Sequence, residues 1–173
     1  TVGITTSIAT VSGVGIIGNG CVFIDNVTID LTHTFVGDIA IFVLAPNGQV
    51  LELSSSNGGA GDNYTNSVFK DNTSSFITSG SPPFTGVWRP EGRQQNTVPP
   101  FSNSNPLGTF TFANTFNGLN ADGDWTLLIN DYVAIDVGVL NSWSITFSQG
   151  GGSGVTVDLG PDITICPGQT VTL

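Results

Sequence analysis

The sequence is poor in basic residues, with 3 lysines and arginines against 13 acidic residues among 173. This balance argues against nucleic acid as a partner, because phosphate binding needs clustered lysine and arginine. The net charge of -10 argues against an anionic membrane surface for the same reason. Charged residues of both signs make up only 9% of the chain, well below the roughly 25% of soluble domains. Few lysines beside abundant asparagine, serine and threonine favour a secreted or cell-surface protein.

Long apolar runs are also missing. No stretch reaches the roughly 18 apolar residues of a membrane-spanning helix, so we expect no membrane insertion. No basic segment precedes an apolar stretch, so the sequence shows no signal peptide. Methionine is absent and glycine numbers 23, a composition that favours strands and turns over helices. Hydrophobic residues still make up 39%, enough for the core of about one domain.

Residue types that carry enzyme chemistry are scarce. His33 is the only histidine, and no Gly-x-Ser-x-Gly turn accompanies it to supply a nucleophile. Glu52 and Glu91 are the only glutamates, and neither has an evident carboxylate partner for glycoside hydrolysis. Cys21 and Cys166 lack metal-ligand spacing, although a disulfide between them is an open alternative. We therefore expect no enzyme.

Short apolar runs with period-2 alternation dominate the chain. Residues 27–48 predict a β-hairpin, in which Val27, Ile29 and Leu31 alternate with polar residues and an apolar run at 39–44 follows a turn. Residues 121–147 repeat this character, with two strands around an acidic loop. Further strands are predicted at 49–53, 68–69 and 107–116, with one or two edge strands in 1–20.

A long irregular stretch at 79–105 interrupts this pattern, and Phe84, Trp88 and Phe101 could anchor it. About eight short strands with frequent turn signals and no convincing helix predict an all-β fold. We expect a jelly-roll-like antiparallel β-sandwich over residues 1–147. A Gly/Ser linker at 148–154 and a C-terminal extension strand within 155–173 would follow it.

Three motifs resemble one family. They are the runs THTFVGDIAIFVLAPNG, PFTGVWRPEG and NADGDWTLLINDYVAIDVGVLNSWSITF. In this order they are similar to the P domain, or Homo B domain, of proprotein convertases and bacterial secreted proteases. The resemblance covers residues 11–147 and implies a jelly-roll sandwich without an active site of its own. It also implies a structural role for His33 and a calcium-dependent supporting role beside a catalytic domain.

Aspartates in turns predict a cation site. Calcium prefers six to eight oxygen ligands, and carboxylates without basic partners would otherwise repel one another. Two acidic loops would supply them, one in each of the two strand–loop–strand blocks. The candidate calcium ligands are Asp38, Asp62, Asn63, Asp71, Asp131 and Asp136.

Aromatic residues raise a second binding hypothesis. Trp125 and Trp143 occupy inward strand positions and are predicted to be core residues. Trp88 lies in the long irregular stretch and is a candidate contact for a glycan or a cell-surface protein.

The C-terminal segment resembles the opening strands of Ig-like or PKD-like repeats in bacterial surface proteins. Val155, Val157 and Leu159 alternate with polar residues, so a strand is predicted without a sheet of its own. It could fold back on its own sandwich, begin a further domain, or add to the edge of a neighbouring copy. Strand addition would build head-to-tail fibres, and we favour it, which makes the chain a self-assembling structural module. The alternative is a calcium-stabilised accessory or carbohydrate- or protein-binding domain of a larger hydrolase or adhesin.

Overall fold

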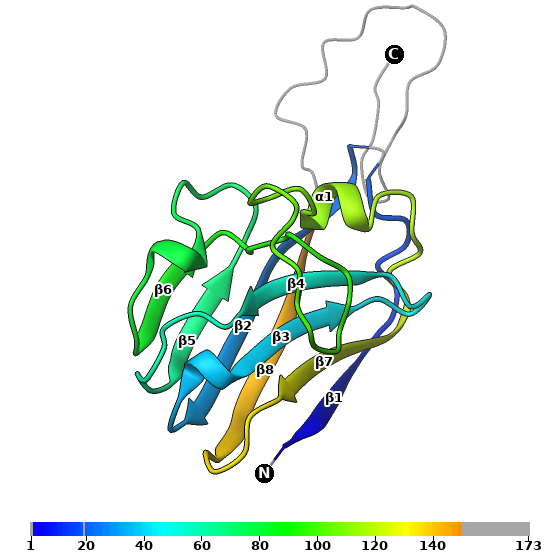
Figure 1. The fold of residues 1–173 in the computed structure, drawn as a ribbon. Coiled ribbons are helices and arrows are strands. Elements are labelled where there is room, and N and C mark those ends of the chain that lie inside the picture. The colour runs from blue at the N-terminus through cyan, green and yellow to red at the C-terminus, as the bar shows by residue number, and fades with distance from the viewer. Residues whose placement is uncertain (1, 19, 150–173) are drawn as a thin grey trace, which may run out of the picture.

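Two four-stranded sheets pack face to face in the computed structural model, which describes residues 2–18 and 20–149 (Figure 1). The strand order is β1-β7-β3-β4 in the first sheet and β6-β5-β2-β8 in the second. The predicted all-β sandwich is thus confirmed. One pair departs from the antiparallel expectation, since β5 and β6 are parallel. The elements are β1 (Gly3–Val11), β2 (Val22–His33), η1 (Val36–Asp38), β3 (Ile39–Leu44), β4 (Val50–Ser55), β5 (Tyr64–Phe69), η2 (Ile77–Ser79), β6 (Phe84–Trp88), α1 (Phe112–Thr115), β7 (Gly123–Asp131) and β8 (Gly138–Gln149).

The predicted hairpin over residues 27–48 is wrong. β2 and β3 belong to different sheets, and the chain crosses between them through η1. β7 and β8 cross between the sheets in the same way, so β3 pairs with β7 while β2 pairs with β8. The true hairpin joins β3 to β4 through a turn closed by Gly48 N donating to Ala45 O. Alternation was correct for β2, but it does not say which strand is the partner.

β3 is apolar on both faces because both faces are covered. Its inward residues Ile39, Ile41 and Val43 belong to the main core. On the outer face, Phe42 is fully buried beneath residues 91–105, which we call the covering loop. Phe101 of this loop lies 5.9 Å from the ring centre of Phe42. A continuous apolar run is therefore the expected pattern for this central strand.

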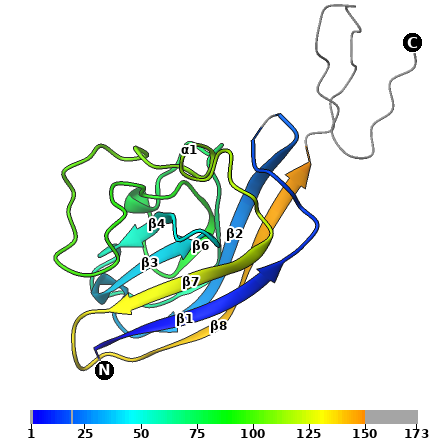
Figure 2. The same ribbon diagram turned by 90° about the vertical axis from the view of Figure 1, so that its right-hand side faces the viewer.

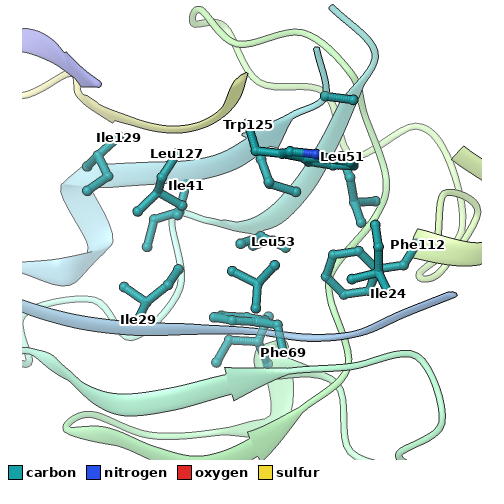
Figure 3. Packing of buried hydrophobic residues seen from close by; sticks show 14 of the residues in the cluster. Ile24, Ile29, Ile41, Leu51, Leu53, Phe69, Phe112, Trp125, Leu127 and Ile129 are labelled. Carbon is teal, nitrogen blue, oxygen red and sulfur yellow. The ribbon is translucent and has the colours of Figure 1, made fainter. Parts of the chain in front are cut away.

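The core lies between the sheets and draws on both (Figure 3). Ile29 from β2 and Phe69 from β5 face Ile41 and Leu127 of the first sheet. A bulge after Ile24 adds one residue to β2 and shifts its inward phase to Val27, Ile29 and Leu31. His33 continues this inward phase, which places it at the end of the core.

Other segments differ from their predicted forms. Residues 107–116 contain no strand, because Phe112 begins the one-turn helix α1, capped by Thr111 and Asn114. The irregular stretch 79–105 contains β6, which the sequence analysis missed. β8 continues to Gln149 through pairing with Val22. Cys166 and most of the predicted linker and extension strand lie outside the described residues, as do Val155, Val157 and Leu159. Within the described ranges, no helix is long and apolar enough to cross a membrane.

Candidate functional site

The two sheet crossings meet at one end of the sandwich, opposite α1 (Figure 1). Residues 34–38 form the first crossing and residues 132–137 the second. Thr34 N donates to Val137 O at 3.2 Å, and Tyr132 N donates to Asp38 O at 3.1 Å. The Thr34 hydroxyl also donates to Oδ1 of Asp136 at 2.9 Å. These bonds hold the two crossings together as one surface.

A third loop, residues 56–63, supports the first crossing. Val36 N donates to Gly61 O and Gly37 N donates to Gly59 O, each at 2.9 Å. A Cβ atom on Gly37 would lie 2.9 Å from the Gly59 backbone, so this contact requires glycine. Asn63 adopts a positive φ of 69° and accepts a hydrogen bond from His33 N at 3.0 Å. The three loops thus fix the main chain around His33.

His33 is buried, with 2% of its surface exposed. Its Nδ1 accepts a hydrogen bond from Phe35 N at 3.1 Å, which places the ring proton of the neutral histidine on Nε2. Nε2 has no hydrogen-bond partner among the described residues. It lies 3.7 Å from Oδ2 of Asp131, too far for a hydrogen bond. The site therefore holds a buried N–H donor beside a carboxylate acceptor.

Carboxylates gather on this end of the molecule. Desolvation, followed by the neighbouring charges of Asp136 and Asp131, raises the pKa of Asp38 above its usual value. Tyr132 closes the group on one side, with its hydroxyl donating to Gly37 O at 2.7 Å. Burial raises the pKa of Tyr132 in turn. The local field is negative and favours neutral or positively charged ligands over anions.

Five of the six predicted calcium ligands share this end, namely Asp38, Asp62, Asn63, Asp131 and Asp136. Asp71 does not, because its two carboxylate oxygens accept from Phe112 N and Ala113 N at the α1 end. The donors are of the type that calcium prefers. Within residues 2–18 and 20–149, no three His, Cys, Asp or Glu side chains are arranged to hold a metal ion. Calcium binding stays a prediction.

A cavity of about 290 Å³ opens beside His33, between the edges of the two sheets. β1 forms one wall and the start of β8 the other, and Figure 2 shows these strands side by side. Further along, Nε1 of Trp143 donates to the Ser7 hydroxyl at 3.0 Å and joins the two edges. The lining residues are Val2, Gly3, Ile4, Thr5, Leu31, His33, Ile129, Asp131, Val137, Gly138 and Leu140.

A buried carboxylate pair was missed by the sequence analysis, which gave the glutamates no partner. Desolvation by burial is the main cause that raises the pKa of Glu91, and the charge of the fully buried Glu52 raises it further. Glu52 accepts from Arg93 N, Gln94 N and the Gln94 side chain, at 2.7, 3.2 and 2.7 Å. Glu91 accepts from Ser55 N and from the Asn57 amide. Both glutamates thereby bind the covering loop to the sheet. In the sequence, the only indication of this role is the position of Glu52, a charged residue between two leucines of a predicted strand.

The tryptophans lie largely within the protein. Trp125 is fully buried, and Trp143 is half-buried against the core, as predicted. Trp88 also packs against the core, with its ring edge-on to Phe84 at 6.2 Å. Nε1 of Trp88 is buried and has no hydrogen-bond partner in the described part of the chain. Trp88 is thus only partly exposed, and glycan contact through its ring stays a prediction.

The family model for the proprotein convertase P-domain matches residues 25–147. The chain belongs to this family. The resemblance inferred from the three motifs is thus confirmed, and His33, Asp38 and the second crossing all lie inside the matched part of the P domain.

Relatives of this P domain are much longer proteins. Leupeptin-inactivating enzyme 1 of Streptomyces exfoliatus is 28% identical over 121 residues, which cover 70% of this chain and 18% of that protein. A serine protease of Aeromonas sobria is similar with a TM-score of 0.31 and 14% identity, over 84% of this chain and 24% of that one. The same protease in complex with the chaperone ORF2 gives a TM-score of 0.29 and 13% identity, with the same coverage. The P domain thus spans about a fifth of the curated relative that it matches.

Proposed function

We propose that this P domain is a non-catalytic accessory module of a larger extracellular protein. Membership of the P-domain family over residues 25–147 supports the accessory role. The share of 18% that the chain covers in its curated relative supports a larger parent protein. The low content of lysine and arginine supports the extracellular setting.

The state of His33 carries the non-catalytic part of the proposal. It is the only histidine in the sequence, so any histidine base would have to be this residue. Its Nδ1 is occupied by Phe35 N, and its Nε2 carries the proton and faces Asp131. A general base must reach the proton of a nucleophile through a free ring nitrogen. His33 has none, and it acts as a structural link between β2 and the first crossing.

The glutamates support the same conclusion. A glycosidase needs two carboxyl groups facing a sugar across an open site. Glu52 and Glu91 are instead buried, with 0% and 2% exposed. Glu52 accepts hydrogen bonds from the covering loop, and Glu91, which belongs to that loop, accepts one from Ser55 N of β4. Their geometry suits anchoring of that loop.

A direct test is to assay the purified chain for hydrolysis of casein, of p-nitrophenyl acetate and of p-nitrophenyl glycosides. We expect rates equal to those of buffer, and a cooperative thermal transition that shows a folded protein. Turnover that is lost in His33→Ala, while the variant stays folded, would overturn the proposal. An inert, well-folded chain would support it.

Two finer hypotheses remain predictions. Fibre assembly rests on Val155, Val157 and Leu159, which lie outside the described residues, and a long uncharged edge strand, β1, would be the acceptor. Glycan binding through Trp88 is not favoured by the packing of that side chain against the core. Deletion of residues 155–173 tests fibre assembly. A glycan array with a Trp88→Ala control tests glycan binding.

A further inference from the structure

The cavity beside His33 combines apolar walls with one buried donor. Its aliphatic lining comes from both sheets and includes Ile4, Leu31, Ile129, Val137 and Leu140. At its inner end, Nε2 of His33 carries a proton without a hydrogen-bond partner among the described residues. A buried donor in this state costs about 1–3 kcal/mol relative to a paired one. A ligand that brings a hydrogen-bond acceptor would recover that interaction.

The His33 ring is held so that this donor faces the cavity. Nδ1 is fixed by Phe35 N, and the opposite ring edge faces Gly138 and Asp131, which both line the cavity. A Cβ atom on Gly138 would lie 2.4 Å from Cδ2 of His33, so the close contact between this main chain and the ring requires glycine. The carboxylate of Asp131 adds an acceptor close to the donor. In an extended segment the C=O and N–H of one residue point to the same side, so they match a donor and an acceptor that lie side by side.

Charge limits the kind of ligand further. Residues 2–18 and 137–149, which supply both edge strands, contain no Asp, Glu, Lys, Arg or His, although the chain carries a net charge of -10. Asp131 lines the cavity, and the carboxylates of Asp38 and Asp136 lie near enough to Asp131 or to each other to interact. An anion would be repelled here, and a cation would gain nothing from the His33 N–H. A neutral ligand fits this side of the sandwich.

β1 also offers main-chain groups to a ligand. It pairs only with β7 among the described strands, so its other edge is open beside the cavity. Natural edge strands are usually blunted by lysine, proline or a bulge, and β1 has none of these. Extended peptides add to such edges, where main-chain hydrogen bonds give affinity and adjacent pockets give specificity. Ile4 and Val137 are 52% and 60% exposed at the cavity mouth, so a bound ligand would bury apolar surface there.

We propose that this cavity is a binding site for an extended, uncharged aliphatic segment of a partner protein. The segment adds to the open edge of β1 at residues 3–5 and places one aliphatic side chain against Ile4 and Val137. The C=O of one of its residues accepts from Nε2 of His33, and the N–H of that same residue donates to Asp131. The proposal goes beyond the accessory role and stands independently of it.

The test uses the smallest ligand with this chemistry, N-acetyl-leucine N-methylamide, titrated into the ¹⁵N-labelled chain. We expect saturable amide shifts confined to residues 2–5, 31–33 and 137–140, with a dissociation constant on the order of 1 mM. N-acetylglycine N-methylamide lacks the aliphatic side chain and should bind about tenfold more weakly. N-acetyl-leucine carries a carboxylate and should also bind more weakly, because of the nearby aspartates.

Two matched variants locate the site. Val137→Ser removes a lining side chain, and Val139→Ser removes one of equal exposure, 62% against 60%, that does not line the cavity. Val137→Ser should weaken binding about tenfold, whereas Val139→Ser should leave it within about twofold. Both side chains are exposed, so both variants should fold, which their spectra will show.

Three results would overturn the proposal. One is equal binding of the leucine and glycine probes, and another is equal loss of binding in both valine variants. The third is a homodimer, seen by light scattering, that Val137→Ser dissociates, since the occupant would then be a second copy of this chain.

Discussion

Replacing Glu52 by alanine should destabilise the protein strongly. The Glu52 carboxylate is fully buried and accepts three hydrogen bonds from the covering loop. Arg93 N is only partly buried and can donate a hydrogen bond to water after the substitution. Gln94 N and the side-chain N–H of Gln94 that donates to Glu52 are buried and would lose their acceptor, while Nε2 keeps its contact with Ser55 Oγ at 3.4 Å.

The magnitude follows from those two donors. Each buried donor without a partner costs about 1–3 kcal/mol, so the loss is about 4 kcal/mol in the free energy of unfolding. Domains of this size unfold with about 5–15 kcal/mol, so the variant would retain about 1–11 kcal/mol. The thermal midpoint should fall by about 8–16 °C, at about 2–4 °C per kcal/mol. Release of Phe101 from Phe42 would add to this loss.

Urea unfolding followed by tryptophan fluorescence at pH 7 measures the effect. Asp124→Ala is the matched control, because it also removes one carboxylate but from an exposed position with a single hydrogen bond from Thr10. We expect its midpoint to stay close to that of the parent chain. Equal midpoints for Glu52→Ala and Asp124→Ala would refute the view that the carboxylate anchors the loop.

Three further predictions concern protons, calcium and assembly. Desolvation and Glu52 raise the pKa of Glu91, so the folded state holds this proton more tightly than the unfolded chain does. Glu91 therefore contributes stability that is present below its usual pKa of about 4.5 and is lost as the pH rises through the raised value. Glu91→Gln should flatten the pH dependence of the urea midpoint between pH 4 and 7, and an unchanged slope would contradict this. Calcium at 100 times its dissociation constant should raise the thermal midpoint by about 5–10 °C relative to EGTA, and less in Asp38→Asn. An identical midpoint in EGTA would argue against the site. Deletion of residues 155–173 should abolish the multimers seen by light scattering and leave a folded monomer. Multimers that persist after the deletion would rule out assembly through the extension strand.

Much of the fold could be predicted from alternation alone. Val27, Ile29 and Leu31 were placed inward correctly, and so were Trp125 and Trp143. Strand partners could not be predicted in this way, because a strand that alternates has the same pattern in either sheet. The hairpin predicted over residues 27–48 failed for this reason. β6 was missed because the parallel partner it needs, β5, lies outside its own sequence window.

The site was predicted only in part. Turn chemistry predicted carboxylates in loops that the structure shows to be the sheet crossings, but it did not predict that Asp71 caps α1 at the far end. The orientation of His33 depends on Phe35 N and on Asp131, which lies 98 residues away along the chain. The burial of Glu52 depends on a loop that returns over the outer face of its sheet. Such contacts follow from tertiary packing and leave no local pattern.

The pairing of early strands with late strands has a consequence for folding during synthesis. Gly3 pairs with Asp131, and Val22 pairs with Gln149, so neither sheet can be completed from the first half of the chain. In a nascent chain leaving the ribosome, β1 stays unpaired until β7 emerges, and the edge of β2 that pairs with β8 stays open until β8 emerges. Folds with such distant pairings form slowly and expose open strand edges meanwhile. The module should therefore fold only after synthesis has passed Gln149, and a chaperone that shields β1 until then would raise its yield.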